Sequence, residues 1–170
     1  MAFAAANLLL EITVISAENL RFNKKSPVKK NTYVTVKTTE SKLQTTSMDR
    51  EGGSYPIWNQ KLMIDMAGHV KYLTLDVQCK NSMGNRKIGK ALIPVSDFMG
   101  GFWPENYLHF LSYRLRDENG ERNGIINISV RVKQATAMVA PPRSQHSWAA
   151  IGVPAGARGN WETVTGVPIW

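Results

Sequence analysis

The strongest constraint on the fold is an alternation of apolar and polar residues with a period of two. In the run GIINISVRVK, Ile126, Ile128, Val130 and Val132 share one face, and polar side chains occupy the other. The same period recurs in LLLEITVIS, TYVTVK, KLMIDM and YLTLDVQC. Such alternation is typical of β-strands that bury one face.

Three shorter runs complete the predicted strands: SKLQTTS, KIGKALIPV and YLHFLSYRL. Gly, Pro and Asn separate the runs at short intervals, and only PVSDFM indicates a single helical turn. About eight strands without a long amphipathic helix predict an all-β fold, an eight-stranded antiparallel β-sandwich.

The alternation ends near Gln134. Residues 134–170 are rich in Ala, Gly, Pro and Ser and show no sustained period. We therefore expect one folded domain over residues 1–133 and a low-complexity, disordered tail over residues 134–170.

The charge lies in the domain and gathers in two loops. The net charge is +8, and the two arginines and one glutamate of the tail leave +7 on residues 1–133. The segments RFNKKSPVKKN and CKNSMGNRKIGK contain nine Lys and Arg residues and no Asp or Glu. Such loops favour an anionic partner, either a membrane surface or a nucleic acid.

The sequence favours the cytosol. A single cysteine excludes an internal disulfide, the apolar N-terminus lacks the basic region of a signal peptide, and Ala2 excludes N-myristoylation. No run approaches the ~20 apolar residues of a membrane-spanning helix. We expect a cytoplasmic protein whose membrane contact, if any, is peripheral, on the cytosolic face of the plasma membrane.

Four segments together resemble a C2 domain: LEITVISAENL, NTYVTVK, YPIWNQKLMI and KIGKALIPVSDF. They occur in the family's order over about residues 8–133. The chain opens on LEITVIS and closes on GIINISVRV, which is similar to the strand order called type II. The resemblance implies a C2 β-sandwich.

Further segments, GGSYPIW, SDFMGGF, LSYRLRDENG and TGVPIW, are similar to the BONZAI-associated proteins, small plant C2 proteins that partner a copine. This resemblance implies a non-enzymatic peripheral membrane protein that binds phospholipid. It also implies a negative regulator of plant defence, the hypersensitive response and programmed cell death.

Calcium-binding C2 domains place Asp residues in the first and third loops. The matching positions here hold no carboxylate, and are Lys24 or Lys25, Asn31, Cys79, Asn81 and Asn85. Calcium prefers carboxylate oxygens, so we expect no metal and no cofactor in these loops. Regulation by calcium through a copine partner or another site stays open.

A loop that is already cationic needs no calcium to approach anionic lipid. Each Lys or Arg near such a surface contributes on the order of 1 kcal/mol. Phe22 and Met83 lie near the loop tips and either insert as shallow anchors or pack locally. The predicted lipid-binding residues are Arg21, Phe22, Lys24, Lys25, Lys29, Lys30, Lys80, Met83, Arg86 and Lys87.

The segment DFMGGFWPENYLHF gathers five aromatic residues around two glycines and a proline. It forms either a lid on the core or a partner surface, with Trp103 the expected exposed residue. The terminal TVTGVPIW is apolar and suits a short docking peptide. Trp103, the adjacent pair Val167 and Pro168, and Trp170 are therefore candidates for binding the copine-type partner.

Other functions find less support. Tyr33, Tyr55 and Trp58 could stack on bases but lie in strand motifs, and lysine exceeds arginine in the two loops, so nucleic-acid binding is not expected. The histidines are scattered, and Cys79 lies on the inward face of its strand, so we expect no enzyme. Two alternatives stay open: calcium-dependent phospholipid binding through acids elsewhere, and a protein-interaction module without lipid binding.

Overall fold

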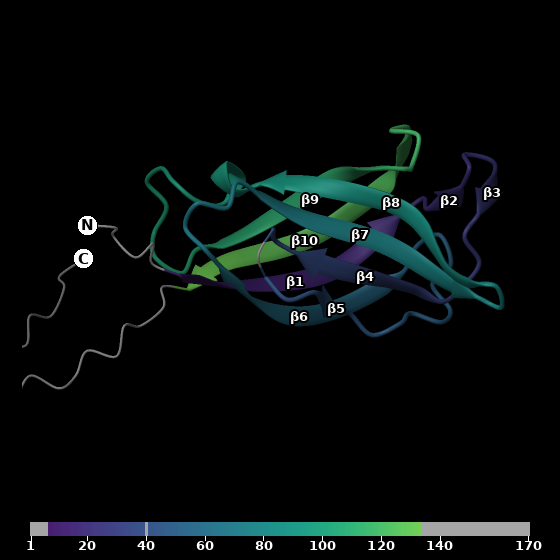
Figure 1. Ribbon diagram of the computed structural model, residues 1–170, viewed down its shortest axis with the longest axis horizontal. Coiled ribbons are helices and arrows are strands. Elements are labelled where there is room, and N and C mark those ends of the chain that lie inside the picture. Colours follow the sequence, from purple (N-terminus) through teal and green to yellow (C-terminus); the bar gives the residue numbers. More distant parts are fainter. Residues whose placement is uncertain (1–6, 40, 134–170) are drawn as a thin grey trace, which may run out of the picture. The chain divides into compact units, whose positions relative to one another are not determined.

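A computed structural model describes residues 7–39 and 41–133 (Figure 1). The described elements belong to one compact unit, Met1–Ala135. The predicted tail, with Val167, Pro168 and Trp170, lies outside the described residues.

The described chain is all-β apart from one 3-10 turn, η1 (Val95–Asp97), where a helical turn was expected. The strands are β1 (Leu8–Glu18), β2 (Arg21–Phe22), β3 (Ser26–Pro27), β4 (Thr32–Lys37), β5 (Gln44–Thr45), β6 (Ile57–Met66), β7 (Tyr72–Asn81), β8 (Gly84–Pro94), β9 (Leu108–Arg116) and β10 (Arg122–Lys133).

Eight of these strands form an antiparallel sheet in the order β5-β4-β7-β8-β9-β10-β1-β6, and β2 pairs with β3 as a separate hairpin. Strands β8 and β9 meet at a single residue pair, Lys90 and Arg116. The sheet folds at this junction, so β5-β4-β7-β8 forms one layer and β9-β10-β1-β6 the other (Figure 1). The predicted eight-stranded sandwich is confirmed.

The core is made of the side chains that the alternation placed on the inner faces. Leu10, Ile12 and Val14 of β1 are fully buried, and so are Leu73, Leu75 and Val77 of β7. Removal of these apolar side chains from water is the main force that holds the layers together. The period-two prediction therefore identified the core correctly.

Three connections meet at one end of the sandwich: the loop between β1 and β4, the turn between β7 and β8, and the turn between β9 and β10 (right side of Figure 1). The connection from η1 to β9 lies at the opposite end. The two basic segments of the sequence therefore share an end, and the aromatic segment occupies the other.

Candidate functional site

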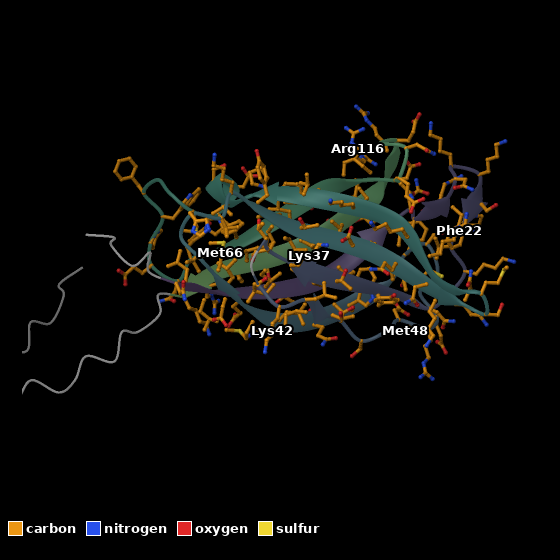
Figure 2. All side chains as sticks on the ribbon, viewed as in Figure 1. Phe22, Lys37, Lys42, Met48, Met66 and Arg116 are labelled. Carbon is orange, nitrogen blue, oxygen red and sulfur yellow. The ribbon has the colours of Figure 1, made fainter. Side chains whose placement is uncertain are left out.

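A pocket of about 580 Å³ lies between the β1–β4 loop and the β7–β8 hairpin. We call it the basic pocket. Its lining residues are Phe22, Ser26, Pro27, Lys29, Lys30, Asn31, Cys79, Lys80, Asn81, Ser82 and Arg86. Figure 2 shows Phe22 at this end of the molecule.

The pocket carries positive charge that no carboxylate balances. Lys29 and Lys30 come from the loop, Lys80 from the end of β7 and Arg86 from the start of β8, and all four side chains are exposed. No Asp or Glu lines the pocket. Within the described part of the chain, none of the four forms an ion pair.

Three backbone carbonyls around the pocket are already hydrogen-bonded. The Cys79 thiol donates to the Lys30 carbonyl oxygen at 3.2 Å, and the Lys80 amide donates to the Asn31 carbonyl oxygen at 2.9 Å. The Asn31 side-chain amide donates to the Lys80 carbonyl oxygen at 3.2 Å. These oxygens therefore already accept hydrogen bonds. The rest of the lining combines four cations and a few hydroxyl and amide groups with the apolar Phe22 and Pro27, and its net positive charge suits an anion.

The prediction that Cys79 lies on the inward face of its strand is confirmed, because Cys79 is 4% exposed. Burial raises the pKa of the Cys79 thiol, and the nearby Arg86 opposes this rise only in part. The thiol therefore stays protonated at neutral pH, as its hydrogen bond to Lys30 requires.

Arg86 is held in place by an aromatic ring. Its guanidinium lies over the Phe22 ring, 4.5 Å from the centroid, and Phe22 itself is half-buried and packs against the core. A cation above an aromatic face is attracted by the ring quadrupole. The contact restricts Arg86 at the pocket wall, and it shows that Phe22 packs locally.

The base of the β1–β4 loop is fixed by two polar side chains that the sequence did not point to. The Asn123 side-chain amide donates to the carbonyl oxygens of Arg21 at 2.8 Å and Ile88 at 2.7 Å, and its oxygen accepts the Arg21 amide at 3.0 Å. The Ser54 hydroxyl donates to the Leu20 carbonyl oxygen at 2.7 Å. The alternation pattern gives no signal for these contacts, because Asn123 and Arg21 are 102 residues apart in the sequence.

The remaining predicted lipid-binding residues lie around this end but outside the pocket. Met83 is at the tip of the β7–β8 turn and is 95% exposed. Lys25 is exposed in the loop, while Arg21 and Lys87 line a small neighbouring cavity of about 80 Å³. Lys24 forms an ion pair with Glu121.

The far side of the same end carries acids as well as cations. The β9–β10 turn carries Asp117, Glu118 and Glu121, and the first two line the small cavity beside Arg21, Lys87 and Arg86, which also lines the basic pocket. The positive charge is therefore partly balanced on the β9–β10 side. It is unbalanced on the side of the basic pocket.

The positions that match calcium ligands in related domains present amides, a thiol and a lysine. Asn81 accepts the Met83 amide at 3.0 Å, and Asn31 and Cys79 make the hydrogen bonds described above. Residues 7–39 and 41–133 contain no group of three or more His, Cys, Asp or Glu side chains that could hold a metal ion. Over the same ranges, no helix has the length and apolar character needed to cross a membrane.

The aromatic segment at the opposite end is partly core and partly surface. Phe98 is buried, whereas Phe102 is fully exposed and Trp103 is 55% exposed. Trp103 stacks on Tyr107 with the ring centroids 5.0 Å apart, and His109 meets Trp103 edge-on at 5.1 Å. Trp103 is exposed as expected, but Phe102, which the sequence did not single out, exposes more of its side chain.

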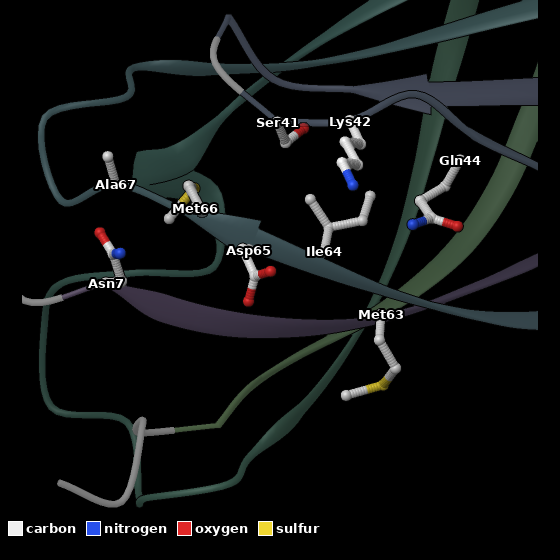
Figure 3. Close-up of a pocket in the computed structure, with 9 residues that line it drawn as sticks. All are labelled: Asn7, Ser41, Lys42, Gln44, Met63, Ile64, Asp65, Met66 and Ala67. Atoms are coloured by element: carbon white, nitrogen blue, oxygen red, sulfur yellow. The ribbon is translucent and has the colours of Figure 1, made fainter.

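A second cavity, of about 350 Å³, lies beside the end of β6 away from the basic loops (Figure 3). Its charged lining residues are one cation, Lys42, and one carboxylate, Asp65. Since these charges cancel, the cavity lacks the excess of positive charge that distinguishes the basic pocket.

Comparison with known proteins gives both sequence relatives and structural neighbours. The sequence profile of the C2 domain matches residues 8–109. BON1-associated protein 2 of Arabidopsis thaliana is 37% identical over 202 residues, which cover 100% of this chain and 97% of that protein.

Two solved structures share the fold. The C2A domain of plant Extended Synaptotagmin 1 superimposes with a TM-score of 0.62 at 15% identity, covering 79% of this chain and 99% of that chain. Human GIVD cytosolic phospholipase A2 gives a TM-score of 0.62 at 19% identity, covering 79% of this chain and 17% of that chain. At these identities the likeness concerns the fold alone.

Proposed function

Because this chain belongs to the C2 domain family, we propose that it is a non-enzymatic peripheral membrane protein that docks onto anionic phospholipid. The observation that carries the proposal is the basic pocket, where four cations line one cavity without a carboxylate. Each cation near an anionic membrane contributes on the order of 1 kcal/mol, and the attraction falls away within a Debye length. Docking of this kind is sensitive to salt.

The docking is proposed to be independent of calcium. A calcium ion takes six to eight oxygen ligands, mainly from carboxylates. The basic pocket offers no carboxylate, and the carbonyl oxygens of Lys30, Asn31 and Lys80 already accept hydrogen bonds. Its lysines would also repel the ion. The cations of the chain itself take the place that calcium holds in related domains.

The uneven charge of this end gives the docked domain an orientation. The basic pocket turns toward the membrane, and the acidic β9–β10 turn is kept away from it by repulsion. Met83 extends from the β7–β8 turn with its side chain 95% exposed, so it is placed to enter the interface as a shallow apolar anchor. We assign the cytosolic face of the plasma membrane as the docking surface.

Co-sedimentation of the full chain with phosphatidylcholine vesicles, with and without phosphatidylserine, tests the docking. We expect binding that needs phosphatidylserine and that falls at least tenfold in the double variant Lys80→Ala/Arg86→Ala. The matched control, Lys42→Ala/Lys71→Ala, removes two exposed cations at the opposite end and should bind as the wild type does. Equal losses in both variants would mean that net charge alone drives binding, and no binding to either vesicle would refute lipid docking.

The proposed partner is a copine-type protein. The name of BON1-associated protein 2 records an association with BON1, and the resemblance to BONZAI-associated proteins implies a copine partner and restraint of plant defence and programmed cell death. The exposed Phe102 and Trp103 lie at the end that docking leaves free, and aromatic side chains are favoured in protein interfaces. Val167, Pro168 and Trp170 are further candidates outside the described residues.

A binding assay with a purified copine tests this surface. We expect Trp103→Ala and Phe102→Ala each to weaken the complex at least fivefold, since exposed aromatic anchors contribute more than 1 kcal/mol when they are buried in an interface. Phe110→Ala removes an exposed ring from the outer face of β9 and serves as the control. Unchanged affinity in both loop variants would remove the support for this partner surface.

A further inference from the structure

We propose that Ser26 is a phosphorylation site for a proline-directed protein kinase, and that its phosphate switches off membrane docking by cancelling charge in the basic pocket. The switch rests on the proposed docking function, because it regulates the same site. Ser26 and Pro27 form the only serine–proline or threonine–proline pair in the chain, and Lys29 lies two positions beyond the proline. Proline-directed kinases favour this pattern of serine, proline and a following basic residue.

The two neighbours of Ser26 fit the substrate groove of such a kinase for separate physical reasons. Proline has no backbone N–H, so Pro27 leaves no donor unpaired against a groove wall that offers no acceptor. The Lys29 ammonium is attracted by anionic groups further along the groove. The segment from Ser26 to Lys29 therefore meets both requirements of the enzyme.

The fold presents Ser26 to an enzyme. Residues 23–27 are all exposed, and no hydrogen bond among the described residues engages the Ser26 hydroxyl. Ser26 and Pro27 form β3, which is already extended and pairs only with β2, outside the eight-stranded sheet. A two-stranded hairpin has little stability of its own, so a kinase can bind this segment without opening the sandwich.

Ser26 lies among the cations that docking needs, since it lines the basic pocket together with all four of them. Its partner across the hairpin is Phe22, and the Arg86 guanidinium lies over the Phe22 ring at 4.5 Å from the centroid. A phosphate on Ser26 therefore enters the wall of the pocket that holds Arg86. Arginine binds phosphate through two parallel hydrogen bonds, so the modified loop satisfies its own cations.

The charge of the phosphate is large compared with the charge of the pocket. Phosphoserine carries about −1.5 to −2 at neutral pH, and the pocket lining carries four positive charges. Each positive charge near an anionic membrane strengthens binding about fivefold. Modification of Ser26 should therefore weaken docking by about tenfold or more.

The modification is an ordinary phosphoryl transfer from ATP. The Ser26 Oγ forms a bond to the γ-phosphorus, while the bond from that phosphorus to the β–γ bridging oxygen breaks and ADP leaves. The hydroxyl proton passes to a carboxylate of the kinase. The chain supplies only the acceptor hydroxyl and the residues that position it.

A kinase assay on the full chain tests the site. The chain is incubated with ATP and a purified cyclin-dependent kinase, and the products are mapped by mass spectrometry. We expect phosphate on Ser26, no transfer to Ser26→Ala, and about tenfold slower transfer to Pro27→Ala, which keeps the hydroxyl. Transfer to other residues in place of Ser26, or an unchanged rate in Pro27→Ala, would overturn the site.

Vesicle binding tests the switch. The phosphorylated and untreated chains are co-sedimented with phosphatidylserine vesicles in chelator, and we expect phosphorylation to weaken binding by about tenfold or more. Ser26→Glu, with one added negative charge, should weaken it about fivefold. The matched control is Lys71→Glu, which changes the net charge by about −2 at the opposite end, where the Lys71 carbonyl oxygen accepts the Val95 amide of η1 at 2.9 Å. This control should bind as the wild type does.

The outcomes separate the switch from the proposed function. Phosphate on Ser26 with unchanged vesicle binding would overturn the switch and leave anionic docking intact. Equal losses in the phosphorylated chain and in Lys71→Glu would also overturn it, because net charge would then govern binding. If the untreated chain binds no vesicle, docking and the switch both fail, and the kinase assay alone decides the modification site.

Discussion

The side chain of Asn123 is buried between the β1–β4 loop and β8, and its amide joins the two through hydrogen bonds to Arg21 and Ile88. Removal of a buried amide leaves its hydrogen-bond partners unpaired, which lowers the free energy of unfolding. The base of the β1–β4 loop therefore depends in part on a residue from a distant part of the chain.

We expect Asn123→Ala to lower the free energy of unfolding by about 1–3 kcal/mol and to weaken lipid binding, because the loop loses its anchor. Urea denaturation and vesicle co-sedimentation measure the two effects. Asn119→Ala is the matched control, since among the described residues its backbone amide, and not its side chain, makes a hydrogen bond, to Asp117. Equal stability of the two variants would contradict this role of Asn123.

Glu11 is a buried acid on the outer face of β1, and three cations surround it. Its carboxylate lies 2.7 Å from the Lys133 ammonium, 3.2 Å from the Lys61 ammonium and 3.4 Å from the Arg131 guanidinium. The hydrogen bond from Lys133, supported by Lys61, outweighs burial and lowers the pKa of Glu11 from 4.5. The pairing joins β1 to its two neighbouring strands.

When the pKa of a carboxyl group is lower in the folded state than in the unfolded state, the ionised group stabilises the folded protein at pH values above its unfolded-state pKa. This stabilisation is lost as the pH falls through the folded-state pKa. Glu11→Gln should therefore cost about 1–2 kcal/mol at pH 7, and the difference from wild type should shrink as the pH falls below 4.5. Chemical denaturation at a series of pH values measures this. A difference that does not change with pH would contradict the assignment.

Among the elements, the start of β10 must pass close to the end of β1. Gly124 adopts a φ of 69°, and a Cβ atom there would lie 2.5 Å from the Glu18 carbonyl oxygen. The register of β10 against β9 shifts at this point, between Arg122 and Ile125. Only glycine combines that backbone conformation with so close an approach.

We expect Gly124→Ala to destabilise the domain by about 2–4 kcal/mol, because it adds a collision to the strain of a positive φ. Gly120, in the β9–β10 turn, has a φ of 78°, but a Cβ atom there meets no atom within 4 Å, so Gly120→Ala should cost only about 1 kcal/mol. Thermal denaturation of the pair measures the difference. Similar losses would mean that the approach to Glu18 is not a constraint.

The strands and the core were predictable because period-two alternation depends on neighbouring residues. The inner faces of β1, β7 and β10 follow directly from their sequences. The basic character of the two loops was also readable, since each loop is a contiguous acid-free segment. Neither segment indicates that the other lies beside it in the fold. The cavity between the two loops could therefore not be predicted from the sequence.

Two of the missed features depend on distant pairings. The ion pair of Lys24 with Glu121 and the anchoring by Asn123 join segments about a hundred residues apart in sequence. Phe102 is more exposed than Trp103 because the Trp103 ring stacks on Tyr107, whereas the Phe102 ring remains in solvent. Composition and periodicity do not encode such contacts.

On the scale of the whole molecule, the two candidate surfaces lie at opposite ends of one sandwich (Figure 1). The basic pocket and Met83 occupy one end, and Phe102 and Trp103 the other. A domain docked through its basic end therefore presents the aromatic end away from the lipid. This arrangement suits an adaptor that holds a protein partner at a membrane.

We propose that the cations of the basic pocket replace calcium. The most direct test of this proposal is co-sedimentation of the full chain with phosphatidylserine vesicles at constant ionic strength, once with calcium and once with a chelator. We predict the same bound fraction in both conditions and the same loss in Lys80→Ala/Arg86→Ala in both. Binding that disappears in the chelator would contradict the account, because the pocket residues would then be insufficient without the metal ion.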